Sequence, residues 1–519
     1  METKNNEENA ELNNDYSDIE KSIKKPRNTK TLILIIILAI ILLISIITII
    51  IVFNSSSSEQ EENNNNNKDE NINYLNIIKA KYDNKGSDRI KLINYDKSNI
   101  KLFLNGREIN FTKTYQFTEP GDQLIEFKFN EELTDLNSLF RGCEMLKEID
   151  FSNIKKSNIK AMNNLFEDCT SLEKVNLDNL NTSNVETMSS MFEGCTNIKE
   201  INLKNFDTSK VTSMEKMFQN CKALVSVNLE KFNTRNVITM ESMFARCSNL
   251  KTININNFDL TNTLKANSMF FLCESLKEVK LKNENINGNS SSIDMNGMFE
   301  KCYSLEEINL EQFERKKIKK IEYMFLYCYS LTSIDTTKFD TSEATNFYSV
   351  FDGCSSLKSL DLSQINTEKV TTMNSLFRDC TSLEFLDLSN WKTPQVTSMI
   401  ALFYNCSSLS NVKLYNFNTS KVHSMQFMFE NCCSLEKLDL SMFDIKNVRD
   451  IRSLFEDCNS LNELNLSNFN GTKIQPSFCS RMFETNGPNA TIIYNPEIFG
   501  VNLINEIPQG WDKNNLTKI

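Results

Sequence analysis

Residues 191–198 read Met191-Phe192-Glu193-Gly194-Cys195-Thr196-Asn197-Ile198, and this box recurs along most of the chain. Its cysteine recurs with a 26-residue period, which is broken only by a 29-residue interval between Cys273 and Cys302. The thirteen copies are marked by Cys143, Cys169, Cys195, Cys221, Cys247, Cys273, Cys302, Cys328, Cys354, Cys380, Cys406, Cys432 and Cys458. A fixed period of this length indicates a stacked repeat, in which each copy buries its apolar face against its neighbours. We therefore predict one solenoid over residues 136–483.

Each repeat contains two patterns of apolar residues. The first consists of Val185, Met188, Met191, Phe192, Cys195 and Ile198, whose spacing of mostly three residues places them on one stripe of a helix. The second is the alternation of Ile201 and Leu203 about the polar Asn202, which is typical of a short, half-buried strand. One short parallel strand plus one helix in every repeat predicts an α/β solenoid of the leucine-rich-repeat type.

The spacing Leu357, Leu360, Leu362, Ile365 supports this interpretation. The copy LKSLDLSQINTEKVTTMNSLFRDC, from Leu357 to Cys380, resembles the repeat of the BspA-like leucine-rich family, which is also known from Mycoplasma lipoproteins. The resemblance implies a surface-exposed protein, several members being adhesins, and it covers about two thirds of the chain. This chain lacks the lipobox cysteine of the lipoprotein members, so its anchoring differs from theirs.

The N-terminal part predicts a different anchor. Residues 31–53 contain no charge, and about 23 residues at ~1.5 Å each suffice to cross a bilayer as a helix. Basic residues crowd before this segment and acidic residues follow it, which favours a type II signal-anchor with the repeats outside the cell. Residues 1–30 then form a disordered cytoplasmic tail, and residues 54–74 a flexible stalk.

Both ends of the solenoid need covering. Period-2 alternation between residues 75 and 135, with the turn Asn105-Gly106, predicts a small β cap domain. After Cys458 the repeat fades, and residues 484–519, which contain Trp511, are expected to form the C-terminal cap.

Composition bears on the class of ligand. The net charge of −11 argues against nucleic acid as a partner, because phosphate binding needs a basic surface.

The chain has one histidine, His423, and no serine or cysteine is marked as its partner for nucleophilic catalysis. The cysteine column has no C-x-x-C pair, so we interpret it as buried free thiols rather than a zinc site. We predict no catalytic role, no cofactor and no metal.

The residue between the two inward-facing apolar residues of each strand is almost always Asp, Asn or Lys. Alternation places this column on the solvent side of the sheet, where Asp335, Asp361 and Asp387 stack as a like-charge run. A run of this kind calls for a cation or a basic partner, although it also fits a solvated consensus position. The candidate binding surface comprises Ser333, Asp335, Ser359, Asp361, Phe385, Asp387, Lys413, Tyr415 and Asp439.

These observations predict a membrane-anchored recognition or adhesion module that binds a protein or glycan ligand of another cell or matrix. One alternative is a structural coat or spacer without a specific ligand. The other is a polysaccharide-cleaving enzyme, which would need two carboxylates in a cleft.

Overall fold

The computed structural model describes residues 74–86, 89–95, 100–280, 291–310, 316–487 and 489–515. The chain divides into two compact units, Met1–Ile72 and Asn73–Ile519, and every described residue belongs to the second. The predicted cytoplasmic tail, the apolar segment 31–53 and nearly all of the predicted stalk lie outside the described residues. Within the described part, no helix combines the length and the hydropathy that a membrane span needs.

The N-terminal region of this unit is built of short and long strands. They are β1 (Asn76–Asn84), β2 (Arg89–Lys91), β3 (Lys101–Leu104), β4 (Arg107–Ile109), β5 (Thr114–Gln116), β6 (Gly121–Phe129) and β7 (Leu146–Ile154). Asn105 and Gly106 join β3 to β4 with φ angles of 47° and 84°, as a primed two-residue turn requires. The main sheet has the order β4-β3-β6-β1-β7-β8. Its pairs are antiparallel except β7–β8, which is parallel and begins the solenoid.

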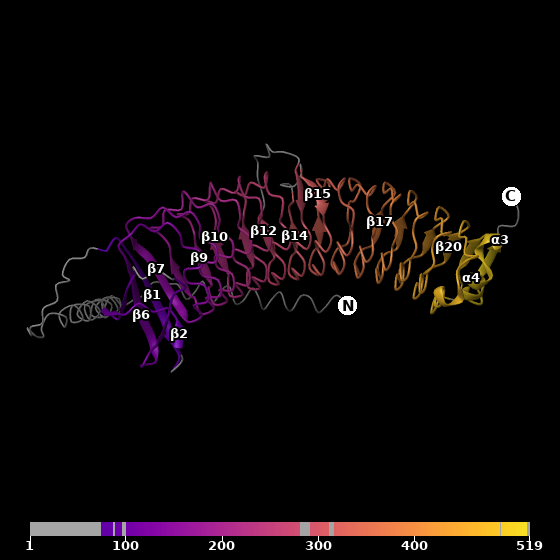
Figure 1. Cartoon of the computed structure of the whole chain (residues 1–519). Coiled ribbons are helices and arrows are strands. Elements are labelled where there is room, and N and C mark those ends of the chain that lie inside the picture. The colour runs from indigo at the N-terminus through magenta and orange to yellow at the C-terminus, as the bar shows by residue number, and fades with distance from the viewer. Residues whose placement is uncertain are drawn as a thin grey trace, which may run out of the picture. The chain divides into compact units, whose positions relative to one another are not determined.

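The solenoid repeats one short strand per coil, except in the coil of Ser359 and Asp361, where no strand is assigned (Figure 1). These strands are β8 (Lys174–Asn176), β9 (Glu200–Asn202), β10 (Ser226–Asn228), β11 (Thr252–Asn254), β12 (Glu278–Lys280), β14 (Glu307–Ile308), β16 (Ser333–Ile334), β17 (Phe385–Asp387), β18 (Asn411–Lys413), β19 (Lys437–Asp439) and β20 (Glu463–Leu466). A second line of parallel pairing contains β13 (Ser292–Asp294) and β15 (Lys317–Lys320). Elsewhere that line consists of single bridges one coil apart, such as Thr187 with Ser213. The register is that of the repeat, since Ile201 lies beside Val227.

The predicted helix in each repeat is wrong, because the box folds into consecutive turns. In one coil the N–H groups of Lys216, Phe218 and Asn220 donate to carbonyls of the next coil, at 2.9, 2.9 and 2.7 Å. The intervening N–H groups of Met217 and Gln219 donate three residues back, to Met214 and Lys216. Lys216 and Asn220 have φ angles of 56° and 62°, and this left-handed backbone cannot continue an α-helix. The protein is therefore a β-solenoid of stacked coils.

Helices in the described residues are confined to the C-terminal end. They are the 3-10 turn η2 (Pro476–Phe478), α3 (Pro496–Phe499) and α4 (Val501–Glu506). There β21 (Thr491–Tyr494) and β22 (Asp512–Asn515) extend the sheet beyond β20. Trp511 packs against Phe483 with ring centroids 5.1 Å apart and donates from Nε1 to the carbonyl of Gly487. This end of the apolar stack is thus covered by the chain itself.

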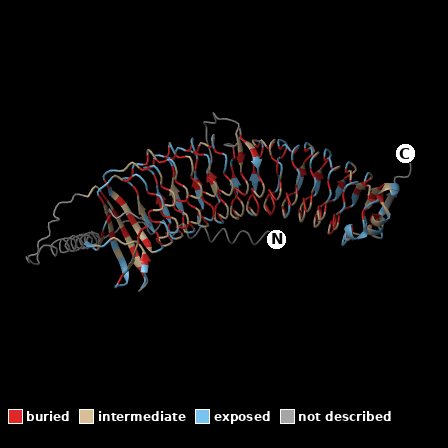
Figure 2. Cartoon of the chain, viewed as in Figure 1, coloured by how far each residue is buried: buried red, intermediate tan, exposed pale blue. Residues whose placement is uncertain are grey.

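The core includes two columns of identical side chains, and Figure 2 shows that buried residues recur in the successive coils. The phenylalanines of the box stack from coil to coil; Phe192 and Phe218, for example, have centroids 5.7 Å apart and rings 7° from parallel. The cysteines form a second column, in which Cys195 Sγ donates to the carbonyl of Phe166, 3.1 Å away in the preceding coil. The same bond recurs in every coil up to Cys458. These thiols are free and buried, and burial raises their pKa values.

Candidate functional site

The outward positions of the short strands form a continuous surface, which we call the sheet face. It carries two rows of side chains, because each strand has one outward residue before and one after its buried central residue. Glu200, Ser226 and Ser359 belong to the first row, and Asn202, Asn228 and Asp361 to the second. Parallel register places each residue of a row beside its equivalent one coil on, at a strand spacing of about 4.8 Å.

The Asp and Asn column has a local structural role. Asn202 Oδ1 accepts a hydrogen bond from the N–H of Lys204 at 3.2 Å, and Asp361 Oδ1 accepts from the N–H of Ser363 at 2.9 Å. The same bond, to the residue two positions on, recurs along the column. Asn and Asp are favoured here because their side chains can close the turn that follows the strand. One side-chain oxygen per residue is used in this way.

The structure places eight of the nine predicted binding residues in these two rows, and Tyr415 two residues beyond the end of β18. Ser333, Asp335, Ser359, Asp361, Phe385, Tyr415 and Asp439 are exposed, whereas Asp387 and Lys413 are half-buried. Phe385 and Tyr415 are 44% and 54% exposed, which is unusual for large rings in this molecule. The predicted use of this surface as a binding site stays a prediction.

The like-charge run of Asp335, Asp361 and Asp387 is relieved within the protein. Lys413 Nζ lies 2.8 Å from Asp387 Oδ2, and this lysine, together with bonds from Ser389, lowers the pKa of Asp387 to about 2. Bonds from the N–H and the side chain of Ser363 lower the pKa of Asp361, while Asp335 opposes that shift. Lys413 also lies over the ring of Phe385, 5.4 Å from its centroid.

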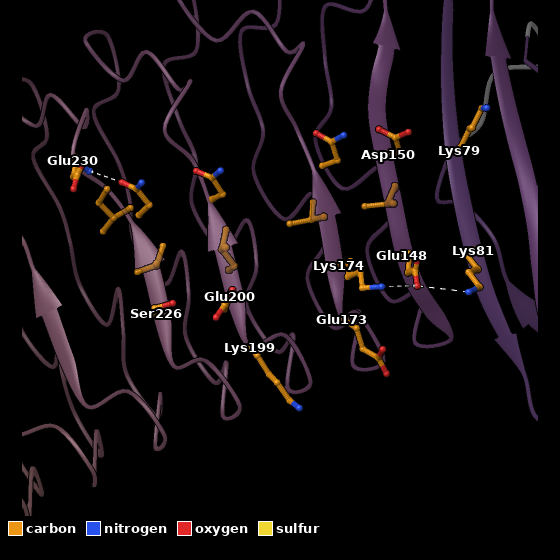
Figure 3. A pocket seen from close by; sticks show the side chains of 18 of the residues that line it. Lys79, Lys81, Glu148, Asp150, Glu173, Lys174, Lys199, Glu200, Ser226 and Glu230 are labelled. Atoms are coloured by element: carbon orange, nitrogen blue, oxygen red, sulfur yellow. Dashed lines mark hydrogen bonds and ion pairs between the residues drawn. The ribbon is translucent and has the colours of Figure 1, made fainter. Parts of the chain in front are cut away.

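A large hollow of the sheet face lies at its other end, which sequence reasoning did not single out. It is a groove of about 1090 Å³ over β7 to β10 that reaches Asn254 of β11 and is bounded by Lys79 and Lys81 of β1 (Figure 3). It is lined by Lys79, Lys81, Leu124, Glu148, Ile149, Asp150, Glu173, Lys174, Val175, Asn176, Lys199, Glu200, Ile201, Asn202, Ser226, Val227, Asn228, Leu229, Glu230 and Asn254. A second hollow of about 660 Å³ follows over β12 to β16 and reaches Ser333 and Asp335.

Ion pairs along the groove balance much of its charge. Lys81 Nζ lies 2.7 Å from Asp122 Oδ2 and 3.6 Å from Glu148 Oε1, and Lys174 Nζ lies 3.4 Å from the same Glu148 oxygen. The hydrogen bond from Lys81 lowers the pKa of Asp122, while the bond to Asp122 raises the pKa of Lys81. The lining contains four lysines and five carboxylates, so the groove as a whole is close to neutral.

The sequence contains a weak signal for this groove. Asn176, Asn202, Asn228 and Asn254 are four consecutive amides in a column that elsewhere mixes Asp, Asn and Lys. The wall formed by β1 has no such signal, because its position beside β7 depends on pairing between segments about 70 residues apart, such as Lys79 with Asp150.

Candidate metal ligands and the single histidine can be placed in the described part of the chain. There, no group of three or more His, Cys, Asp or Glu side chains has an arrangement that could hold a metal ion. His423, the single histidine, is exposed between the buried residues Val422 and Met425.

Comparison with known proteins identifies the repeat. Residues 111–204, 134–248, 197–293, 293–385 and 376–492 each match the model of a family described as "Mycoplasma protein of unknown function, DUF285". Together these windows span residues 111–492, which is well over half of the 519 residues. The chain belongs to this family. This match agrees with the expected similarity to Mycoplasma repeat proteins. It does not by itself assign the chain to the narrower BspA-like group.

The other comparisons add little. No curated protein matches the chain. Among solved structures, the crystal structure of a TLR13–ssRNA13 complex matches at 15% identity and a TM-score of 0.22. The match covers 74% of this chain and 64% of that one, so less than two thirds of that chain is spanned. At this TM-score, neither its fold nor its ligand is transferred to the present protein.

Proposed function

We propose that this protein is a membrane-anchored recognition module of the BspA-like type, which binds a macromolecular ligand on its sheet face outside the cell. The single observation that carries the proposal is the groove of about 1090 Å³ over β7 to β10 with Asn254 of β11. Binding surfaces are concave and combine apolar area with a few placed polar groups, and this groove has both. The uncharged segment 31–53 supports the surface location.

A regular array suits such a function. The strands present one row of side chains per register position, so a ligand that lies along the stack meets many equivalent contacts. The buried columns of Phe and Cys hold the rows in place, because each coil is bonded to the next through its turns as well as its strands.

The aromatic patch around Lys413 favours a second location for the same function. Lys413 lies over the ring of Phe385, Tyr415 follows two residues after Lys413, and both rings are exposed. Exposed aromatic residues next to a cation are typical of protein-binding surfaces. Either location would make the sheet face the binding surface.

A matched pair of substitutions tests the proposal and separates the two locations. Ser226 and Ser359 occupy the same outward position in different coils, and both are exposed. A tryptophan at position 226 obstructs the groove, whereas at 359 it obstructs the region near Asp361. Cells that display the full chain are tested for saturable attachment to host cells and to matrix-coated surfaces.

We expect Ser226→Trp to weaken attachment at least tenfold and Ser359→Trp to leave it unchanged. The reverse result moves the site to the aromatic patch. Attachment that neither variant alters, or that cells without the protein show equally, refutes recognition through the sheet face and favours a coat or spacer.

A further inference from the structure

Four asparagines form a row along the floor of the groove. Asn176, Asn202, Asn228 and Asn254 occupy the same outward position in four consecutive coils and line the groove. Each uses Oδ1 to accept the N–H two residues on, at 3.1 to 3.2 Å. That bond fixes the orientation of the amide. No described residue bonds the Nδ2 of these four side chains, so each has its amide donor available to a ligand.

The repeat distance of this row selects among extended ligands. Each asparagine is one rung of the row, and neighbouring rungs are about 4.8 Å apart, which is the spacing of paired strands. A peptide lying along the row advances ~3.3 Å per residue. Its polar groups therefore no longer lie opposite the asparagines after one or two residues. One unit of an extended β-linked polysaccharide is close to the rung spacing in length, so each sugar unit meets one amide.

The charge of the groove selects a neutral ligand. Four lysines and five carboxylates line it, and Lys81, Lys174 and Glu148 are already paired with one another or with Asp122. The amide row itself has no charge. A polyanion would be repelled by the five carboxylates of the lining, which outnumber its lysines.

The ends of the row set its length. On one side the equivalent position is Asp150, whose two oxygens accept from the N–H and Oγ of Ser152 at 2.8 and 2.9 Å. On the other side it is Lys280, which lies beside Asn254 and pairs with Glu278 at 3.7 Å. The uncharged row is therefore four rungs long.

We propose that the groove binds a linear, neutral, β-linked polysaccharide, laid along the stack with one sugar unit on each of β8, β9, β10 and β11. Hydroxyl oxygens of the sugar accept hydrogen bonds from Nδ2 of Asn176, Asn202, Asn228 and Asn254. This inference rests on the proposed recognition function and names the ligand class for the same groove.

The test uses the purified full chain in detergent and two series of soluble β-1,4-linked oligosaccharides, of glucose and of N-acetylglucosamine, each with two, four and six units. We expect one of the series to bind, with an affinity that rises from two to four units and then levels off, because the row has four rungs. Asn202→Ala and Asn228→Ala should each weaken binding about tenfold, the effect of one lost hydrogen bond of ~1.4 kcal/mol.

Asn465→Ala is the matched control. Asn465 holds the same position and makes the same turn bond, to the N–H of Ser467 at 3.1 Å, but lies outside the groove. It should lose as much thermal stability as the groove variants and keep full affinity. Ser226→Trp provides a variant that leaves every turn bond intact and should abolish binding by steric obstruction.

The outcomes separate the two proposals. If neither series binds at millimolar concentration, or if Asn202→Ala and Asn228→Ala bind as tightly as Asn465→Ala, the polysaccharide inference is overturned. If cell attachment is still lost in Ser226→Trp in that case, the recognition function stands and its ligand is a protein. Attachment that the bound oligosaccharide competes away supports both.

Discussion

The phenylalanine column predicts a large and unequal cost for substitutions of one residue type. Phe244 is fully buried and stacks on Phe218 and Phe270, with centroids 5.3 and 5.5 Å away and rings 11° and 5° from parallel. Replacing a buried Phe with Ala removes its transfer free energy and leaves a cavity, which together cost about 3 to 5 kcal/mol. The loss of two ring contacts places Phe244→Ala toward the upper end, because each aromatic pair contributes ~0.5 to 1.5 kcal/mol beyond its area.

Neighbouring coils cannot refill the space. Every Phe of the column is held by its own coil and by hydrogen bonds to the next, such as Phe244 N–H to the carbonyl of Met269 at 2.9 Å. We therefore expect the cavity to persist, so that Phe244→Ala loses nearly the full free energy of unfolding that a buried Phe contributes. Phe385→Ala is the control, since that ring is 44% exposed on the sheet face and its removal leaves no cavity.

Urea unfolding of the full chain in mild detergent, followed by tryptophan fluorescence, measures both variants. The chain has two tryptophans, Trp391 in the coils and Trp511 at the C-terminal end, so the signal reports on the solenoid. We expect Phe244→Ala to lower the free energy of unfolding by about 4 kcal/mol and Phe385→Ala by under ~1 kcal/mol. A loss below ~1 kcal/mol at Phe244, or equal losses at both positions, would refute the stacked-column account.

Three further predictions follow from the buried and paired groups. Cys433 is the one cysteine of the fifteen that is not buried. A thiol reagent at pH 8 should therefore modify one thiol quickly in the native protein and fifteen in denaturant. Rapid modification of several thiols in the native protein would contradict the buried column of cysteines. Burial raises the pKa of Asp352 to about 6 from 3.8, so the folded state holds this proton more tightly and the free energy of unfolding falls as pH rises from about 4 to about 6. Asp352→Asn should therefore unfold with a free energy on the order of 2 kcal/mol higher at pH 8 and unchanged near pH 3, and equal pH profiles of variant and parent would exclude the effect. Finally, Lys413→Ala should raise the pKa of Asp387 from about 2 toward its ordinary value, as carboxyl NMR titration would show; an unmoved titration would mean that Lys413 does not hold that charge.

Much of the fold could be predicted from the repeat. The regular period predicted stacked coils, and the apolar positions of the box, among them Met191, Phe192 and Cys195, are all fully buried. A periodic apolar stripe identifies the buried face whatever backbone carries it, because burial is what the pattern encodes. The thiol column was likewise interpreted correctly as buried free cysteines.

The error over the helix has a physical cause. Residues three or four apart share a face in an α-helix, and they also share a face in a run of consecutive turns. The two differ in where the N–H groups bond, and here every second N–H of the box, such as that of Phe218, bonds to a carbonyl of the next coil. The spacing of apolar residues within one repeat does not show whether an N–H group bonds within its own coil or to the next coil.

The sequence by itself therefore determined the stacking, the buried columns and the Asp and Asn row, because these recur within each repeat. Only the tertiary structure decided that the coils are built from turns and that β1 pairs beside β7 to wall the groove at Lys79 and Lys81. Both depend on hydrogen bonds between segments distant in the chain, whose partners no local spacing specifies.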